Sequence, residues 1–242
     1  FFSFKKMNKI LMFVPSRDRP NIIEKLRTSF NKNTGDFAEL LIILDRDNQE
    51  SYYKHHDLKY EIYDGEAGYA QEKMNHFALK YAKKYKYIGF IGDDNEFITK
   101  NWDSIVYKEL ETKGNIGIGY LNDLMHEQGK AQLHACRNVI MNSDIIEKLS
   151  YMAPLCLRHF YNDNFWYNLG ASLESLVYFN DVRVNHNHFL NEQSKYDKVY
   201  EIAYNNNKME EDGIRYNNYM LLEFNNDLKK ITSNGQSGNN KT

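Results

Sequence analysis

Tyr87-Ile88-Gly89-Phe90-Ile91-Gly92-Asp93-Asp94-Asn95-Glu96 is a short apolar run that stops at a cluster of acids. A run of Ile and aromatic residues ending at a glycine is typical of a buried strand, and open α/β sheets bind their ligands at the carboxyl ends of the strands. Adjacent carboxylates repel each other unless a cation or a hydrogen-bonding ligand lies between them, and their oxygens suit Mg²⁺ or Mn²⁺. The alternative is an acid pair that only caps the next helix, for which Asp94 or Asn95 would serve.

The first strand of the chain also leads into polar residues. Lys9 to Val14 is a continuous apolar run, followed by Pro15, Ser16 and Arg17 and then by a helix that starts near Asn21. A hydroxyl, a guanidinium and free backbone amides at the start of a helix indicate an anion site. A solvated turn with surface arginines is the alternative.

A second buried strand, Glu39 to Leu44, ends at Asp45. Two strands that deliver polar residues to the same end of a sheet indicate a shared site, although Asp45 would also suit a turn or a cap. Tyr60 to Tyr63 predicts a short third strand, and Gln71 to Lys84 predicts an amphipathic helix with Lys73 in its first turn. With the strand before Asp93 and a helix from Trp102 to Leu110, this order is that of a doubly wound α/β fold.

The second half of the chain contains two further strand signals and two further helix signals. Ile116 to Leu121 predicts a strand that ends at Asn122 and Asp123, whereas Gln132 to Met141 is either a strand or an irregular segment. Ser143 to Leu149 predicts a short helix. A further helix follows Asp163 and carries Trp166, and Asp163 would serve either as a functional acid or as the cap of that helix.

Val182-Arg183-Val184-Asn185-His186-Asn187-His188 alternates with period two. The alternation places Val182, Val184, His186 and His188 on one face of a strand. A buried histidine is either a ligand or a satisfied core group, and a pair beside an acid-rich site favours metal ligation.

Composition sets broad limits on the class of protein. The chain has 242 residues and a formal charge of -2, so it lacks the global basic field of proteins that bind duplex DNA tightly. Cys136 and Cys156 are too few for a metal or disulfide framework and are expected in the core of a cytoplasmic protein. We expect no secretory leader and no membrane span. Glu210 to Asp227 predicts a last helix, and 232–242 has the composition of a disordered tail.

Taken in order, the motifs resemble those of GT-A fold glycosyltransferases akin to family 2, and more closely a group of them encoded by bacteriophages. The resemblance covers Ile10 to Tyr200. It rests on Val14-Pro15-Ser16-Arg17 with Arg19-Pro20, Asp45, Gly92-Asp93-Asp94 with Trp102-Asp103, Asn122-Asp123, Arg158-His159-Phe160-Tyr161 with Asp163-Asn164 and Trp166, Asp181-Val182, and His186-x-His188 with Lys195 and Asp197.

The resemblance implies an α/β fold: a Rossmann-like GT-A domain over 1–200, with a mostly parallel sheet flanked by helices, then a helical appendage over 201–231 and the tail. It also implies an Asp-x-Asp type site for Mn²⁺ or Mg²⁺, from which this sequence departs because Asn95 holds the third position and Glu96 follows. On this basis Asp94 would bind the metal together with His186 or His188. Asp163 corresponds to the acid that serves as the base in the family.

The remaining implied roles concern the two substrates. The residues expected to bind the nucleotide sugar are Pro15, Ser16, Arg17, Asp45, Lys73 and Asp93. Those expected on the acceptor side are Asn122, Asp123 and Trp166.

The activity implied is transfer of a hexose or pentose from a nucleoside-diphosphate sugar, a UDP-sugar above all, to an acceptor hydroxyl with inversion. A divalent ion would stabilise the departing diphosphate. The phage group suggests a hydroxymethylated pyrimidine in DNA as the acceptor and the host cytoplasm as the location. A glycan-modifying transferase, a nucleotidyltransferase and a non-catalytic nucleotide- or sugar-binding module remain alternatives.

Overall fold

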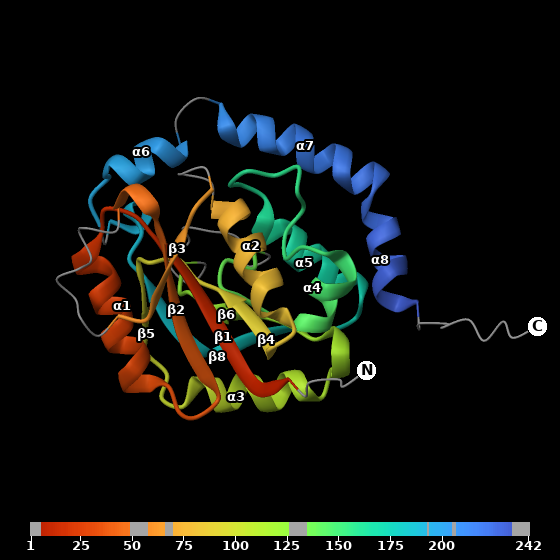
Figure 1. Cartoon of the computed structure of the whole chain (residues 1–242), viewed down its shortest axis with the longest axis horizontal. Coiled ribbons are helices and arrows are strands. Elements are labelled where there is room, and N and C mark those ends of the chain that lie inside the picture. The colour runs from red at the N-terminus through yellow and green to blue at the C-terminus, as the bar shows by residue number, and fades with distance from the viewer. Residues whose placement is uncertain are drawn as a thin grey trace, which may run out of the picture.

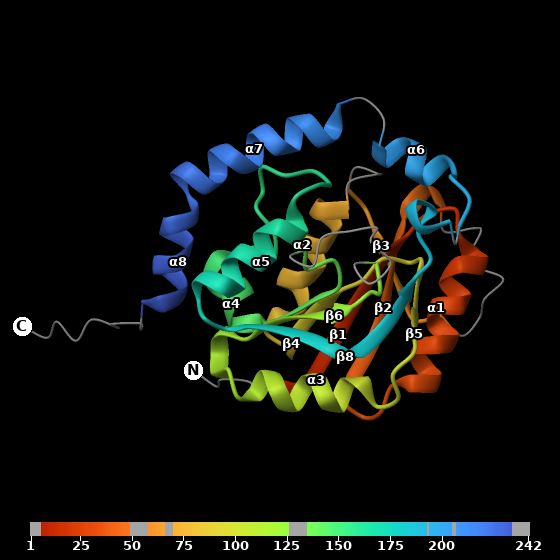
Figure 2. The ribbon, with the colours of Figure 1, turned by 180° about the vertical axis from the view of Figure 1, so that it is seen from behind.

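A computed structural model describes residues 6–48, 58–65, 70–125, 135–192, 194–204 and 207–233. In these ranges an eight-stranded sheet has helices on both faces (Figures 1 and 2). Its strands are β1 (Met7–Ser16), β2 (Ala38–Asp45), β3 (Tyr60–Tyr63), β4 (Tyr85–Phe90), β5 (Asn95–Phe97), β6 (Ile118–Asn122), β7 (Val139–Asn142) and β8 (Leu176–His186). The α-helices are α1 (Pro20–Asn33), α2 (Ala70–Ala82), α3 (Trp102–Glu111), α4 (Ser143–Leu149), α5 (Asn162–Ser172), α6 (Lys198–Tyr204), α7 (Lys208–Leu222) and α8 (Phe224–Thr232).

The sheet is mostly parallel, as the sequence predicts. Its order is β3-β2-β1-β4-β7-β6-β8-β5. The pairs β2–β3, β1–β2, β1–β4 and β6–β8 are parallel, while β7 lies antiparallel between β4 and β6 and β5 pairs antiparallel with β8. Continuous apolar runs form the central strands because both faces of the sheet are covered.

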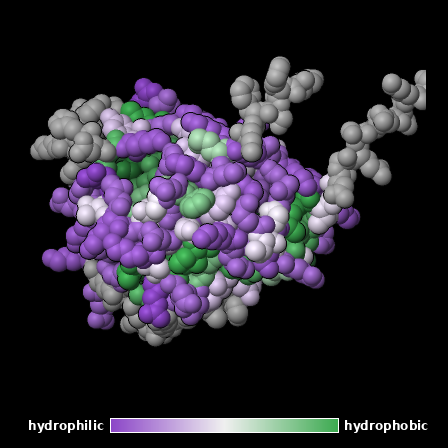
Figure 3. Space-filling model, turned by 90° about the horizontal axis from the view of Figure 1, so that it is seen from below, coloured by the Kyte–Doolittle hydropathy of each residue, from purple (hydrophilic) through white to green (hydrophobic). Residues whose placement is uncertain are grey.

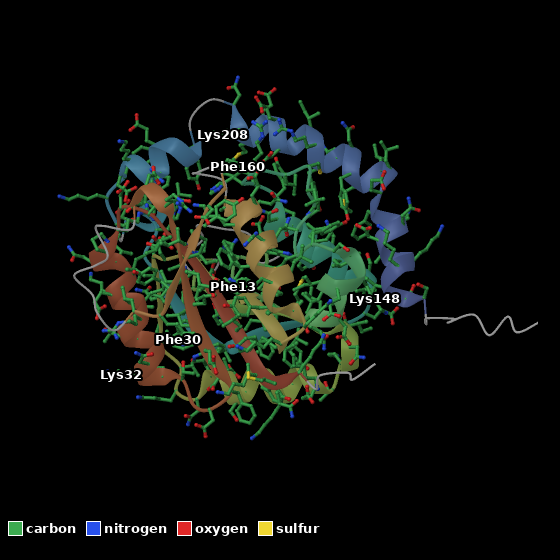
Figure 4. The ribbon with its side chains drawn as sticks, viewed as in Figure 1. Phe13, Phe30, Lys32, Lys148, Phe160 and Lys208 are labelled. Atoms are coloured by element: carbon green, nitrogen blue, oxygen red, sulfur yellow. The ribbon has the colours of Figure 1, made fainter. Side chains whose placement is uncertain are left out.

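Two hydrophobic cores lie on either side of β1. Leu11 and Phe13 point into the core beneath α2, α4 and α5, where Phe13 packs edge to face against Phe77 at 6.3 Å between ring centroids. Met12 and Val14 belong to the opposite core beneath α1 and α3, which also contains Phe30. Figure 4 labels Phe13 on the central strand and Phe30 on α1.

The sheet opens between β1 and β4 at the end where the site forms. The β1–β4 pairing stops at Phe13 and Phe90, whereas β1 continues beside β2 as far as Ser16. Pro15, which has no N–H to donate, is therefore tolerated where β1 has lost one neighbour. After β4 the chain leaves the sheet and brings the acid pair into this opening, the usual ligand position in such folds.

The fold excludes one alternative reading of the sequence and corrects two predictions. The acid pair does not cap a helix, because Asn95 begins the short strand β5 and the next helix starts only at Trp102. The strand with the two histidines ends at His186, and His188 N–H turns back to bond His186 O at 2.8 Å. Cys156 is exposed rather than in the core, whereas Cys136 is buried as expected.

The helices α7 and α8 form a C-terminal arm along the outer edge of the molecule (Figures 1 and 2). The single helix predicted over 210–227 is instead α7 and α8, which meet at Glu223. Lys148 Nζ of α4, labelled in Figure 4, donates to Ile231 O of α8 at 2.5 Å. Thr232 and Ser233 are part of the described chain, whereas the rest of the predicted tail, 234–242, lies outside it.

The undecided segment over 132–141 is resolved in part. Val139–Asn142 is the strand β7, and residues 132–134 lie outside the described ranges. The face shown in Figure 3 is mainly hydrophilic, with small separate hydrophobic patches. No helix in the described part of the chain is long and apolar enough to cross a membrane.

Candidate functional site

A cavity of about 370 Å³ lies at the opening of the sheet. Its wall combines the end of β1, the first turns of α2, the acid pair, the segment before β7, residues 158–163 with Trp166, the end of β8 and parts of α6 and α7. Ten residues singled out from the sequence line it together: Pro15, Ser16, Arg17, Lys73, Asp93, Asp94, Asp163, Trp166, His186 and His188.

Three other predicted site residues do not line the cavity. Asn122 is fully buried, donates to Asn180 O at 3.0 Å and accepts from Leu124 N at 2.9 Å, so it organises the end of β6. Asp123 accepts from Arg137 Nε at 2.5 Å and lies behind His186. These positions give no support to the acceptor-side roles predicted for Asn122 and Asp123.

Asp45 is the third of these residues. It is 1% exposed, accepts from Lys73 Nζ at 2.7 Å and from Arg17 at 3.0 Å, and its other oxygen lies 2.6 Å from Lys73 Nζ. Arg17 and Lys73 line the cavity, whereas Asp45 does not. Asp45 therefore holds the side chains of Arg17 and Lys73 at the cavity wall. A direct contact between Asp45 and the nucleotide stays a prediction.

The first carboxylate of the acid pair is held by the loop after β1. Asp93 accepts from Ser16 Oγ at 2.7 Å and from Arg19 at 2.9 Å. Burial raises the pKa of Asp93 above its usual range, although the charge of Arg19 opposes this. Arg19 also donates twice to Asp197, at 2.8 Å each, and lies 4.3 Å above the ring of Tyr200.

The second carboxylate faces the end of β8. Asp94 Oδ1 lies 3.3 Å from His186 Nε2, and Oδ2 accepts from the Tyr200 hydroxyl at 2.7 Å. Burial opposes ionisation of Asp94, but His186 outweighs it and holds the pKa of Asp94 below its usual range. Burial likewise lowers the pKa of His186, yet Asp94 and Asp123 raise it to about 9. Burial and the charge of His186 lower the pKa of His188 to about 4.

The chemistry of these side chains fits a divalent cation held by two protein ligands. Within the described ranges, no three His, Cys, Asp or Glu side chains form a ready metal site. Asp94 Oδ1 and His186 Nε2 are 3.3 Å apart, close to the roughly 3 Å that separates neighbouring ligand atoms around an octahedral ion with bonds of about 2.1 Å. Such ions commonly take one or two protein ligands and substrate phosphates. His188 instead accepts from Leu190 N through Nδ1 at 3.2 Å.

Asp163 enters the cavity wall from the start of α5. The N-cap position of α5 is Tyr161, and Asp163 lies inside the first turn, where its Oδ1 accepts from Asn164 N at 3.0 Å, so Asp163 is not the N-cap of the helix. Burial raises the pKa of Asp163 above its usual range. A carboxylate with raised proton affinity in a cleft suits a general base.

Sequence reasoning missed several residues of the wall. Arg137 follows Cys136 in the segment that periodicity left undecided, and Lys208 begins α7. Tyr200 and Tyr204 come from a tyrosine-rich stretch without a periodic signal. Phe160 and Lys208, both labelled in Figure 4, also line the cavity.

Comparison with solved structures identifies the fold. The sequence matches no protein-family model and no curated protein. The structure is similar to S. aureus TarS 1-349 in complex with UDP-GlcNAc (TM-score 0.54, 12% identity, 93% of this chain and 76% of that one). It is also similar to the mannosyltransferase PcManGT from Pyrobaculum calidifontis in complex with GDP-Man and Mn²⁺ (TM-score 0.55, 11% identity, 92% and 72%).

A third similar structure is glucosyl-3-phosphoglycerate synthase from Mycobacterium tuberculosis with Mn²⁺, UDP-glucose and phosphoglyceric acid (TM-score 0.52, 11% identity, 74% and 72%). In two other TarS structures, the match covers only 36% and 59% of the TarS chain. These neighbours are GT-A glycosyltransferases that bind nucleotide sugars. The chain therefore has the GT-A fold predicted from its sequence.

Proposed function

We propose that this chain is a metal-dependent glycosyltransferase that moves a sugar from a nucleoside-diphosphate sugar, with UDP as the nucleotide, to an acceptor hydroxyl. One observation carries the proposal: the acid pair, His186 and Asp163 line one cavity of a GT-A fold together with the basic side chains of Arg17 and Lys73. The solved structures with this fold include complexes with UDP-GlcNAc, UDP-glucose and GDP-Man, two of them with Mn²⁺.

The donor side of the cavity would hold the nucleotide diphosphate. Arg17 and Lys73, fixed by Asp45, present positive charge to it. Asp94 and His186 would hold the divalent ion, which when bound neutralises charge that develops on the leaving diphosphate. Asp93, whose carboxylate is held by Ser16 and Arg19, would accept a hydrogen bond from a hydroxyl of the ribose or the sugar.

On the acceptor side, Asp163 would take the proton of the attacking hydroxyl. A base in a single displacement must face the anomeric carbon from the side opposite the leaving group, and the product is then inverted. Burial keeps the proton affinity of Asp163 high, which favours this proton transfer. Trp166, which also lines the cavity, donates its indole N–H to Met152 O at 2.7 Å and so offers only its ring to a substrate.

For the acceptor we propose the hydroxyl of a hydroxymethylated pyrimidine in DNA. Aromatic side chains at His159, Phe160 and Tyr204 line the cavity together with Arg158 and Lys208. Aromatic rings stack on an unpaired base and cations attract its phosphates, which suits a nucleotide taken out of the duplex. The formal charge of -2 fits recognition of one extruded nucleotide better than a long duplex footprint.

The deciding experiment measures product release from UDP-, GDP- and CDP-sugars with Mn²⁺, with and without chelator. Hydroxymethylated and unmodified oligonucleotides of the same sequence serve as matched acceptors. We expect release of UDP that depends on metal and is stimulated only by the hydroxymethylated strand. Pyrophosphate release from a nucleoside triphosphate would indicate a nucleotidyltransferase instead, and nucleotide binding without turnover would indicate a binding module.

A further inference from the structure

A buried carboxylate on the C-terminal arm accepts hydrogen bonds from the backbone of the cavity wall. Asp212 of α7 is fully buried, and its Oδ2 accepts from His159 N at 2.8 Å and from Phe160 N at 2.9 Å. Arg158 N lies 3.2 Å from both carboxylate oxygens. Three successive backbone N–H groups thus converge on one side chain, an arrangement that binds anions strongly.

The carboxylate has a counter-ion on its own helix. Arg215 donates to Asp212 Oδ1 at 2.9 Å. Arg215 is partly exposed, whereas the side chain of Asp212 is fully buried. A buried carboxylate needs such a set of partners to stay charged. The three amides and Arg215 together supply these partners to Asp212.

The residues that bond Asp212, 158–160, immediately precede the segment that carries the candidate base Asp163. Residues 158–160 line the cavity, and Asp163 follows three residues later at the start of α5. Between them, Tyr161 has φ 66°, a left-handed conformation that a non-glycine residue keeps only when its surroundings hold it. The ring of Tyr161 stacks on Tyr216 of α7 with centroids 5.4 Å apart.

The close approach of α7 to this loop is built into its sequence. Next to Asp212 stands Gly213, where a Cβ would lie 3.0 Å from the Tyr161 hydroxyl oxygen and 3.3 Å from Cζ. That spacing is tighter than ordinary van der Waals contact, so a side chain here would push the ring away. Asp212, Gly213 and Tyr216 therefore form one surface that matches the loop.

We propose that Asp212 is a positioning residue for the acceptor side of the site. Its carboxylate fixes the backbone of 158–160 and through it the placement of Asp163 and of the aromatic side chains at the cavity. The catalytic half of this inference rests on the proposed glycosyltransferase function. It gives the C-terminal arm a role in the reaction that its distance along the sequence from the acid pair conceals.

Hydrogen exchange in the 242-residue chain tests the contact without any need for turnover. In Asp212→Ala the amides of 158–160 should exchange faster by about tenfold or more, because they lose bonds to a charged acceptor. Asp212→Asn, which keeps the shape of the side chain, should show a smaller change in the same direction and covers the case in which the alanine variant does not fold.

The matched control is Asp227→Asn. Asp227 is also a buried carboxylate of the arm with a basic residue three positions later, but it binds Tyr151 and Tyr219 rather than the loop. We expect the exchange of 158–160 to be unchanged in this variant. Unchanged exchange in both Asp212 variants, or an equal loss in the control, would overturn the contact.

The catalytic half is read from UDP release with UDP-glucose and Mn²⁺ and from UDP affinity. Misplacing the base should slow release on the order of 100-fold in Asp212→Ala while UDP affinity stays unchanged. Full turnover with lost protection would overturn the positioning role. A wild-type chain without turnover on any donor would sink the proposed function and this half with it, while the exchange data would still decide the contact.

Discussion

Replacing Asp45 by Asn probes the buried charge network beside the cavity. Asp45 and Lys73 have side chains 1% and 5% exposed and meet at 2.6 Å, with Arg17 bonding the same carboxylate at 3.0 Å. Removing the carboxylate leaves Lys73 buried without its counter-charge, which typically costs about 3–5 kcal/mol. At about 2–4 °C per kcal/mol for a chain of this length, the melting temperature should fall by roughly 6–20 °C.

The double variant Asp45→Asn/Lys73→Met supplies the control. A buried pair replaced by uncharged groups of similar volume is often neutral, so the double variant should regain most of the lost stability. Circular-dichroism melts of wild type, both single variants and the double variant give the coupling free energy. If Asp45→Asn melts with the wild type, the pair carries no buried charge and the reasoning is refuted.

The same double variant separates folding from binding. Because Lys73 lines the cavity, the double variant should bind UDP with Mn²⁺ more weakly than the wild type does, even though its stability is restored. Titration calorimetry measures this directly. An unchanged affinity would remove Lys73 from the donor side of the site.

Four further outcomes are expected. Asp94→Ala should abolish Mn²⁺-dependent UDP release with the circular-dichroism spectrum unchanged, and Mn²⁺-dependent turnover that persisted would remove the metal assignment. Asp163→Asn should keep UDP affinity and slow transfer by about 10²- to 10⁴-fold, whereas retained transfer would exclude it as the base. Gly89→Ala, whose Cβ would lie 2.2 Å from Met12 Sδ, should destabilise the sheet by about 1–3 kcal/mol in urea titration, and an unaltered midpoint would contradict the packing. Burial opposes ionisation of Glu39, but hydrogen bonds from Tyr85, Lys9 and Lys59 lower its pKa to about 2, below its value in the unfolded chain. The stability advantage of wild type over Glu39→Gln should therefore be full above about pH 4.5 and shrink toward pH 2. A stability difference that does not change with pH would refute this.

The acceptor side illustrates how sequence and structure divide the evidence. Asn122 is the last residue of β6 and Asp123 follows it, close to the predicted end of the strand, yet their side chains bond Asn180, Leu124 and Arg137. A polar residue at the end of a strand can face the cavity or the next turn, and its sequence position is the same in both cases. Only the path of the chain after the strand separates the two.

The histidine pair shows the limit of periodicity. Alternation treats His186 and His188 alike, but β8 ends at His186 and only that ring approaches Asp94 closely, at 3.3 Å. The end of a strand depends on its neighbour, and here the partner β5 pairs with β8 only up to His186. The alternation pattern contains no information about that neighbour.

The sequence by itself determined the doubly wound sheet and the acids at the ends of its strands, because burial on two faces and abrupt polar ends leave a local pattern. The tertiary structure alone decided which side chains meet. Tyr200 reaches Asp94 from 106 residues away, and Asp212 reaches the loop at His159 from 53 residues away. Such contacts depend on where α6 and α7 lie at the cavity wall, and hydrogen bonds between distant segments leave no periodic trace in either segment.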